Sequence, residues 1–213
     1  MRTRVKFCGI TNEEDLAAAV AAGADAVGFN LFEGSSRAID VDRCASLLAQ
    51  VPALVTTVGI VVNPDVAFID EIRRRLPFDL LQFHGDESEA FCVAYGRPYI
   101  KAIRVATAAD LEERAYNFET SRALLLDARV DGAWGGTGVT FDWTLVRNLP
   151  KPVLLAGGLS ADNVGEAIRV ARPWAVDVSG GIEQSSRQKD VSKMNAFMAA
   201  VAAADHSVYG DES

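Results

Sequence analysis

The stretch Val5-Lys6-Phe7-Cys8-Gly9-Ile10-Thr11-Asn12 sets the pattern for the whole chain. Its first four residues have the apolar character of a short buried strand, and Gly9 ends that strand directly after a thiol. Thr11, with Glu14 three residues later, has the spacing of a capping box that opens a helix. The stretch therefore predicts a βα unit with Cys8 at the carboxyl end of its strand, where parallel α/β proteins carry reactive residues.

Seven further β-type runs follow, and helix-like segments alternate with them. We expect strands at Val5–Cys8, Ala24–Leu31, Leu54–Val62, Asp79–Phe83, Tyr99–Arg104, Ala123–Asp127, Val153–Ala156 and Ala175–Val178. Their apolar residues run continuously rather than alternately, which is typical of a parallel sheet covered on both faces. Eight βα units close a barrel. The sequence thus predicts an α/β protein, a single-domain (β/α)8 TIM barrel over residues 1–213, with a frayed polar tail from about residue 204.

The composition argues against nucleic-acid and membrane partners and indicates the redox compartment. The net charge of −8 argues against a nucleic-acid partner bound through a basic face. No apolar run in the sequence reaches the roughly 18 residues of a membrane span, so no membrane partner is expected. Cys8, Cys44 and Cys92 form no CxxC motif, which indicates a reducing, cytoplasmic compartment. Cys44 and Cys92 fall in helix-like segments and are expected to be small core residues.

Two glycine pairs follow the last two predicted strands: Gly157-Gly158 and, after Ser179, Gly180-Gly181. Glycine lets backbone N–H groups approach an anion closely, and the loops after strands seven and eight of a barrel often bind phosphate. A tight turn would by itself account for either pair. The two pairs together, at this place in the fold, favour a site for a small phosphorylated substrate.

Polar residues also fall at or just beyond the other strand ends. They are Cys8, Asn30, Arg37, Asn63, Gln82, His84, Arg104, Asp127 and Asp177. A nearby helix N-terminus lowers the pKa of a thiol such as Cys8, and an apolar surrounding raises the pKa of a carboxyl group such as Asp127. A base and an acid across one small cavity would form a proton-transfer pair. Taken singly, a cysteine after a strand is more often a core residue than a catalytic one, and an aspartate at a strand end often caps a helix or a turn.

Neither a metal site nor a nucleotide site is evident in the sequence. His84 and His206 are the only histidines, and no cysteine, histidine and carboxylate set has metal-site spacing. The run 135–138 (GGTG) lacks the lysine that ends a Walker loop, and the first βα turn lacks a Rossmann fingerprint. We therefore expect no cofactor and no bound metal.

Several motifs carry a family resemblance that runs from about residue 4 to about residue 200. They are 6–11 (KFCGIT), 81–85 (LQFHG), 126–127 (LD), 135–138 (GGTG) with 141–143 (FDW), 155–159 (LAGGL) with 163–164 (NV), and 176–183 (VDVSGGIE). In their order and spacing they resemble the phosphoribosylanthranilate isomerase family of tryptophan biosynthesis. The resemblance implies a (β/α)8 barrel that converts N-(5-phosphoribosyl)anthranilate into 1-(2-carboxyphenylamino)-1-deoxyribulose 5-phosphate by an Amadori rearrangement.

The same resemblance implies roles for individual residues. Asp127 is implied to protonate the ribose ring oxygen as general acid, and Cys8 to remove the C2 proton as general base. Arg37 is implied to hold the anthranilate moiety, and Asp177 to line the cavity. The loops that contain Gly157-Gly158 and Ser179-Gly180-Gly181 are implied to bind the phosphate.

Two residues depart from the family pattern. Ser36 stands where the family usually has a proline before the arginine, which predicts a looser loop around Arg37. Gly180 stands where the family often has a second serine, which removes a hydroxyl donor to the phosphate. Neither change touches Cys8 or Asp127, so the sequence predicts activity and leaves substrate affinity open.

Two other functions stay open at this point. The related histidine-pathway isomerase is expected to use aspartates on both the first and the sixth strand, and Cys8 argues against it. A barrel that binds a phosphorylated ligand without chemistry is the second alternative, and the pair of Cys8 and Asp127 argues against that. The oligomeric state also stays open, because the exterior helix faces of a barrel specify no unique partner.

Overall fold

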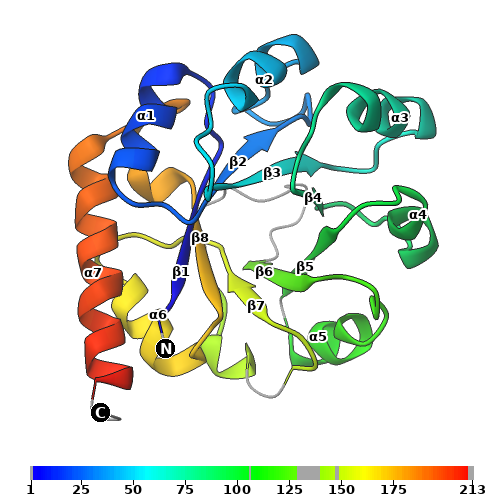
Figure 1. The fold of residues 1–213 in the computed structure, drawn as a ribbon. Helices are drawn as coiled ribbons and strands as arrows, with labels where there is room; N and C mark the ends of the chain where they lie inside the picture. Colours follow the sequence, from blue (N-terminus) through cyan, green and yellow to red (C-terminus); the bar gives the residue numbers. More distant parts are fainter. Residues whose placement is uncertain (1, 106, 129–139, 147–148, 211–213) are drawn as a thin grey trace.

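The computed structural model describes residues 2–105, 107–128, 140–146 and 149–210 (Figure 1). Eight parallel strands form a closed barrel in the order β1 to β8. Each strand pairs with the next one along the chain, and β8 closes the ring on β1 through a register that pairs Lys6 with Asp177. The expected (β/α)8 barrel is confirmed.

The strands of the barrel agree with the predicted runs to within one or two residues at each end. They are β1 (Arg4–Cys8), β2 (Ala26–Asn30), β3 (Thr56–Val61), β4 (Leu80–Phe83), β5 (Tyr99–Val105), β6 (Ala123–Ala128), β7 (Val153–Leu155) and β8 (Ala175–Val178). The α-helices are α1 (Glu13–Ala21), α2 (Val41–Leu48), α3 (Val66–Arg75), α4 (Glu89–Ala94), α5 (Ala108–Ala115), α6 (Val164–Ala171) and α7 (Val191–Tyr209). Two short 3₁₀ segments, η1 (Trp143–Val146) and η2 (Gly180–Ile182), and a small hairpin, β9 (Glu183–Ser185) and β10 (Gln188–Lys189), complete the described chain.

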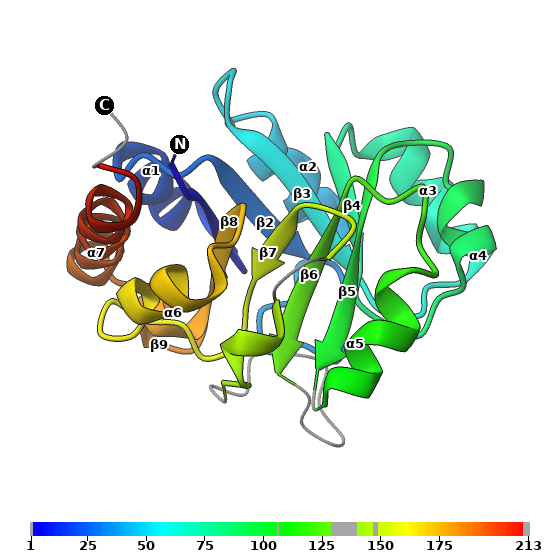
Figure 2. The same ribbon diagram turned by 90° about the horizontal axis from the view of Figure 1, so that it is seen from below.

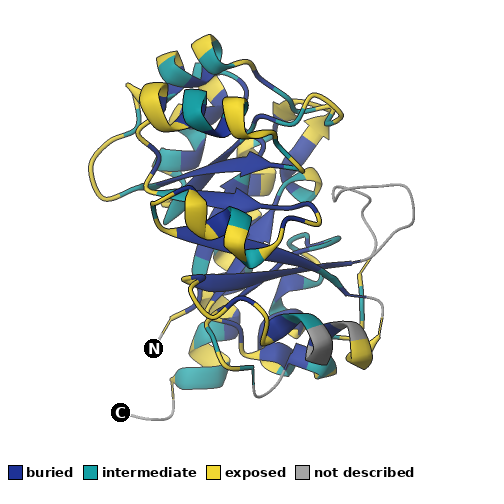
Figure 3. Ribbon diagram, turned by 90° about the vertical axis from the view of Figure 1, so that its right-hand side faces the viewer, coloured by how far each residue is buried: buried dark blue, intermediate teal, exposed yellow. Residues whose placement is uncertain are grey.

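The helices form an outer layer around the strands (Figures 1 and 2). The strands are buried along their length, whereas the outward faces of the helices are exposed (Figure 3). Most of the core lies between the two layers, where Phe7 of β1 meets Phe197 of α7 edge to face at a centroid distance of 6.2 Å. A second apolar cluster, which includes Leu125 and Leu154, is separate from the core between the strands and the helices. Leu125 and Asp127 share one face of β6 because side chains two apart on a strand point the same way.

The start of α1 differs from the expected capping box. Asn12, not Thr11, is the N-cap: its side-chain oxygen accepts from the backbone N–H of Asp15 at 2.8 Å. Its side-chain nitrogen donates to the Asp15 carboxylate at 2.9 Å. Thr11 instead donates its hydroxyl proton to the carbonyl oxygen of Arg187 at 3.2 Å. The prediction of a Thr11–Glu14 box was therefore wrong, because Thr11 is used to join α1 to the β9–β10 hairpin.

The end of the chain also differs from expectation. Helix α7 does not fray near residue 204 but continues to Tyr209. Ala204 is buried, and the Asp205 carboxylate accepts from both the backbone N–H and the hydroxyl of Thr3, at 2.7 and 2.6 Å. The two ends of the described chain consequently lie close together (Figure 3). Among the described residues, no helix combines the length and the apolar character that a membrane span needs.

We predict that Asp205→Ala lowers the free energy of unfolding by about 1–3 kcal/mol, because it leaves two donors of Thr3 without their charged acceptor. Urea denaturation followed by circular dichroism measures the change. Ser207→Ala is the control, since Ser207 is exposed on the same helical turn and should change stability by less than about 0.5 kcal/mol. Equal stability of the two variants would show that the last turns of α7 are not held by Thr3.

Candidate active site

A cavity of about 250 Å³ opens at the carboxyl ends of the barrel strands. It is lined by every residue that the sequence proposed as catalytic or substrate-binding, namely Cys8, Arg37, Asp127, Gly157, Gly158, Asp177, Ser179, Gly180 and Gly181. Asn30, Gln82 and His84 from the longer group of strand-end residues line it too. The barrel thus brings together residues that are far apart in the sequence.

Two residues of that longer group lie elsewhere. Asn63 has a left-handed backbone conformation (φ 45°), and its side chain accepts from the backbone N–H of Asp86 at 2.8 Å. Arg104 donates to the carboxylate of Asp86 at 3.2 Å. Both residues therefore organise the loop after β4. The glycine-rich motif at 135–138 lies outside the described residues.

The thiol of Cys8 is partly buried above the barrel interior. Its sulfur atom fills the space beside Gly28 on β2, where a built Cβ atom would lie 3.1 Å from it. Burial raises the pKa of the Cys8 thiol and the Asp177 carboxylate raises it further, while the ammonium groups of Lys6 and Lys189 oppose both effects. The pKa is therefore above its ordinary value. The expectation of a lowered pKa was wrong because desolvation outweighs the nearby positive charges.

A chain of polar side chains crosses the cavity floor from β8 to β6. Lys6 donates to Asp177 at 2.9 Å and to the side-chain oxygen of Gln82 at 3.2 Å. The Gln82 amide nitrogen contacts His84 Nδ1 at 2.9 Å, and His84 Nε2 lies 3.4 Å from Asp127 Oδ2. The Lys6 pKa is raised: its burial favours the neutral form, but Asp177 and Cys8 favour the charged one more strongly. These hydrogen bonds fix the positions of Asp177 and His84 on either side of the cavity floor.

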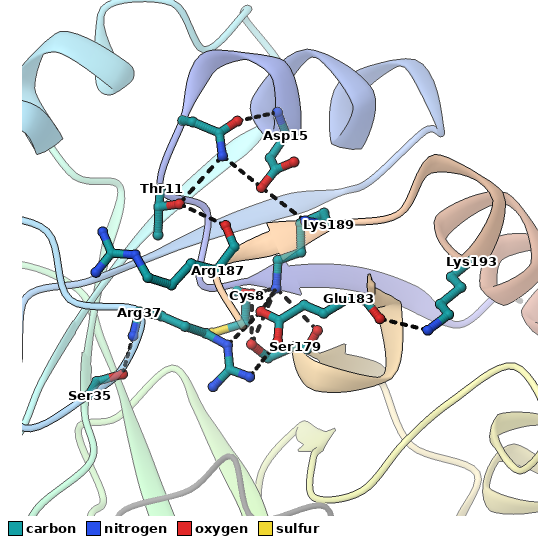
Figure 4. A network of polar contacts seen from close by, with 11 residues as sticks. Cys8, Thr11, Asp15, Ser35, Arg37, Ser179, Glu183, Arg187, Lys189 and Lys193 are labelled. Carbon is teal, nitrogen blue, oxygen red and sulfur yellow. Dashed lines mark hydrogen bonds and ion pairs between the residues drawn. The ribbon is translucent and has the colours of Figure 1, made fainter. Parts of the chain in front are cut away.

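Arg37 reaches the cavity from the loop after β2. Its side chain crosses over Gly9, where a Cβ atom would overlap the Arg37 Cδ atom. Gly9 also has φ of 78°, so a side chain at this position would be disfavoured for two independent reasons. The Arg37 guanidinium donates from Nε and Nη2 to the two carboxylate oxygens of Glu183, both at 2.6 Å (Figure 4).

The two glycine-rich loops pack directly against each other. Gly157 and Gly158 have φ of 85° and 61°, and Asn163 accepts from the Ser160 N–H and donates to the Gly158 carbonyl, both at 2.9 Å. A Cβ atom on Gly181 would overlap the carbonyl oxygen of Leu159. Glycine is thus needed both to turn the loop after β7 and to let the loop after β8 approach it. The resulting concave wall is where an anion can meet backbone N–H groups.

Sequence reasoning missed three charged residues at this site: Lys6, Glu183 and Lys189. Lys6 precedes Cys8 by two positions on β1, so strand alternation could have placed it on the same face. Glu183 belongs to a quoted motif but lies beyond the strand end, and its side chain is buried. Lys189 carries no sequence signal, because only the fold of the β9–β10 hairpin brings it to Cys8. Among the described residues, no group of three or more histidine, cysteine or carboxylate side chains is placed to hold a metal.

The cavity combines a thiol and a carboxyl group on separate strands with a glycine-rich wall from the loops after β7 and β8, an arrangement typical of barrel enzymes that act on phosphorylated substrates. The sequence pattern of the family described as N-(5'phosphoribosyl)anthranilate (PRA) isomerase matches residues 5–200. The chain belongs to this family.

Relatives of similar length support the assignment. An N-(5'-phosphoribosyl)anthranilate isomerase of Pseudomonas putida is 53% identical over 199 residues, which cover 93% of this chain and 97% of that protein. A protein of the same name from Dechloromonas aromatica is 50% identical over 209 residues, which cover 98% of this chain and 100% of that protein. The structure of phosphoribosyl anthranilate isomerase from Thermotoga maritima superimposes with a TM-score of 0.87 at 34% identity, covering 94% of this chain and 99% of that one.

A further solved structure is a phosphoribosyl anthranilate isomerase in complex with reduced 1-(o-carboxyphenylamino)-1-deoxyribulose 5-phosphate. It has a TM-score of 0.84 and 34% identity to this chain, and covers 94% of this chain and 99% of that one.

We predict that iodoacetamide alkylates Cys8 in the native protein slowly near pH 7 and faster as the pH rises. The thiolate is the reactive form, and a raised pKa moves its appearance to higher pH. Cys44 and Cys92 should stay unmodified, because both are buried and burial raises the pKa of each to about 12. Mass spectrometry of labelled peptides measures each site, with Cys8→Ala as the blank. Rapid labelling of Cys8 at pH 6 would contradict the raised pKa.

Proposed function

We propose that the chain converts N-(5-phosphoribosyl)anthranilate into 1-(2-carboxyphenylamino)-1-deoxyribulose 5-phosphate, with Asp127 as general acid and Cys8 as general base. The observation that carries this assignment is the order of groups around the barrel. Asp127 is the last residue but one of β6, Cys8 ends β1, and the loops after β7 and β8 lie between them on the ring. A substrate anchored by its phosphate in those loops would have the acid on one side and the base on the other.

The reaction then needs two proton transfers. Asp127 donates a proton to the ribose ring oxygen as the bond from that oxygen to C1 breaks, and the lone pair of the anthranilate nitrogen forms the C1–N double bond of a protonated Schiff base. The thiolate form of Cys8, which the raised pKa makes the minor form at neutral pH, removes the proton from C2. The electron pair of that C–H bond forms the C1–C2 double bond of an enol amine, and the π pair of the C1–N bond returns to nitrogen. Tautomerisation returns a proton to C1 and gives the ketone. Each transfer by a positioned group contributes about 10²- to 10⁴-fold to the rate.

The same arrangement accounts for substrate binding. The wall that contains Gly157, Gly158 and Gly181 suits the phosphate, and Ser179, whose hydroxyl donates to the Cys8 carbonyl at 3.0 Å, joins that wall to the base. Arg37 is the cation suited to the anthranilate carboxylate, because guanidinium N–H groups form strong, charge-assisted hydrogen bonds to carboxylates. His84 Nε2 has no hydrogen-bond partner among the described residues and lies beside Asp127, so it is available to orient the acid or a sugar hydroxyl.

A cytoplasmic location is part of the proposal. The three cysteines are all free, and a mechanism that uses the Cys8 thiol requires a compartment where thiols stay reduced. The only partner that the mechanism requires is the phosphorylated substrate.

We predict that Cys8→Ala and Asp127→Asn each lower kcat by at least about 10²-fold, because each removes one proton-transfer group. Freshly prepared phosphoribosylanthranilate is added and the decay of anthranilate fluorescence is followed above its spontaneous background. Circular dichroism checks that the barrel of each variant stays folded. Turnover by either variant at the wild-type rate would refute the assignment of that residue.

Two controls match these variants. Cys44→Ala removes a buried thiol outside the cavity, and Asp70→Asn removes an exposed carboxylate on α3. Both should keep wild-type kcat although Cys44→Ala lowers stability. Absence of any turnover by the wild-type protein would refute the proposed function as a whole.

A further inference from the structure

Glu183 makes the closest contacts to the proposed carboxylate-binding residue. Both of its carboxylate oxygens accept from Arg37, at 2.6 Å from Nε and 2.6 Å from Nη2. The side chains are only 6% exposed for Glu183 and 15% for Arg37, so water does not compete effectively for these bonds. Nη1 of Arg37 makes no hydrogen bond within the described residues. The contact therefore orients the guanidinium side-on and leaves Nη1 for another anion.

Glu183 is itself held from both sides. Lys189 Nζ lies 3.0 Å from its Oε1, and Lys193 Nζ donates to its backbone carbonyl at 2.6 Å. Burial raises the pKa of the Glu183 carboxyl, but the hydrogen bond from Arg37 and the charge of Lys189 lower it by more, so the net pKa is below its ordinary value. A carboxylate of this kind stays ionised at neutral pH. Two cations against one anion leave an excess positive charge beside the cavity.

The hairpin that carries these residues is tied to the same strand end as the proposed base. Lys189 Nζ donates to the backbone carbonyls of Cys8 and Ser179, at 2.7 and 3.1 Å. The Lys189 backbone N–H donates to Asp15 of α1 at 3.1 Å. Figure 4 shows Arg37, Glu183 and Lys189 converging on Cys8 from different segments. The position of Arg37 is thereby fixed relative to Cys8.

A buried ion pair of this kind is seldom kept for stability. Desolvation of the two charges costs about as much as their attraction returns, and apolar residues of similar size are often as stable. The pair is more easily explained by the geometry that it imposes. Ser36, where a proline would stiffen the loop, makes the need for such a restraint greater.

We propose that Glu183 is a positioning residue that, held by Lys189, fixes the Arg37 guanidinium beside Cys8 with Nη1 directed to the carboxylate of the substrate's aromatic ring. This inference rests on the proposed function. It predicts that loss of Glu183 weakens recognition of the carboxylate and leaves the rest of the substrate's contacts intact. Glu183 does not touch the reacting atoms.

The test compares two ligands that differ only in the carboxylate. One is reduced 1-(o-carboxyphenylamino)-1-deoxyribulose 5-phosphate, and the other is its phenylamino counterpart without the carboxyl group. Calorimetry gives Kd for each ligand with wild type and with Glu183→Gln. We expect Glu183→Gln to weaken the carboxylated ligand about 10- to 100-fold and to leave the phenylamino ligand nearly unchanged. KM for the natural substrate should rise more than kcat falls.

Glu13→Gln is the matched control. Glu13 accepts from Nη1 and Nη2 of Arg43 at 2.6 Å each, a forked pair made end-on rather than side-on, and neither residue lines the cavity. Its removal should leave both Kd values unchanged. Glu183→Asp keeps the charge with a shorter reach and should fall between wild type and Glu183→Gln. It also serves as the second variant if Glu183→Gln does not fold.

Four results would overturn the proposal. Equal weakening of both ligands would mean that Glu183 only stabilises the hairpin. Tighter binding of the carboxylated ligand would mean that Glu183 competes with the substrate for Arg37. Wild-type protein that neither turns over phosphoribosylanthranilate nor binds either ligand would remove the proposed function and this inference together, whereas active wild type with an unaffected Glu183→Gln variant would remove the inference alone.

Discussion

The closure of β8 on β1 is the constraint on which the rest of the site depends. It pairs the first strand of the chain with the last strand of the barrel, and the ion pair of Lys6 with Asp177 lies across this seam at 2.9 Å. Cys8 ends β1 at this seam, and the segment after β8 carries Ser179 and then the β9–β10 hairpin. The proposed base and the restraint on Arg37 are therefore set by the same piece of sheet.

Buried charge is the second theme of this structure. Lys6 and Lys189 are both buried near Cys8, yet burial still dominates and the pKa of the thiol is raised. Each lysine has a carboxylate partner, Asp177 for one and Glu183 for the other, so much of its positive charge is already balanced. The two lysines therefore mainly hold other groups in place. Lys6 spans the barrel floor, and Lys189 joins the β9–β10 hairpin to the backbone carbonyl of Cys8.

The fold could be predicted from the sequence almost completely, because each strand is a separate apolar run with its own turn residues. The cavity-lining glycines, Cys8 and Asp127 could be predicted because they lie at strand ends or directly after them, and Arg37 because it belongs to the loop after β2. Glu183 and Lys189 could not be recognised, since their proximity to Arg37 arises from a hairpin that pairs only a few residues. The cap of α1 was misassigned because Thr11 makes a tertiary contact that local spacing does not encode.

The raised pKa of Cys8 has a consequence for how the protein meets oxidants. Peroxide attacks thiolates far more readily than thiols, and low-pKa cysteines are the ones that become sulfenic acid. A proposed base that rests mostly as a neutral thiol is therefore a poor target for peroxide between turnovers. Burial at the end of β1 therefore disfavours oxidation of this sulfur atom to a sulfenic acid.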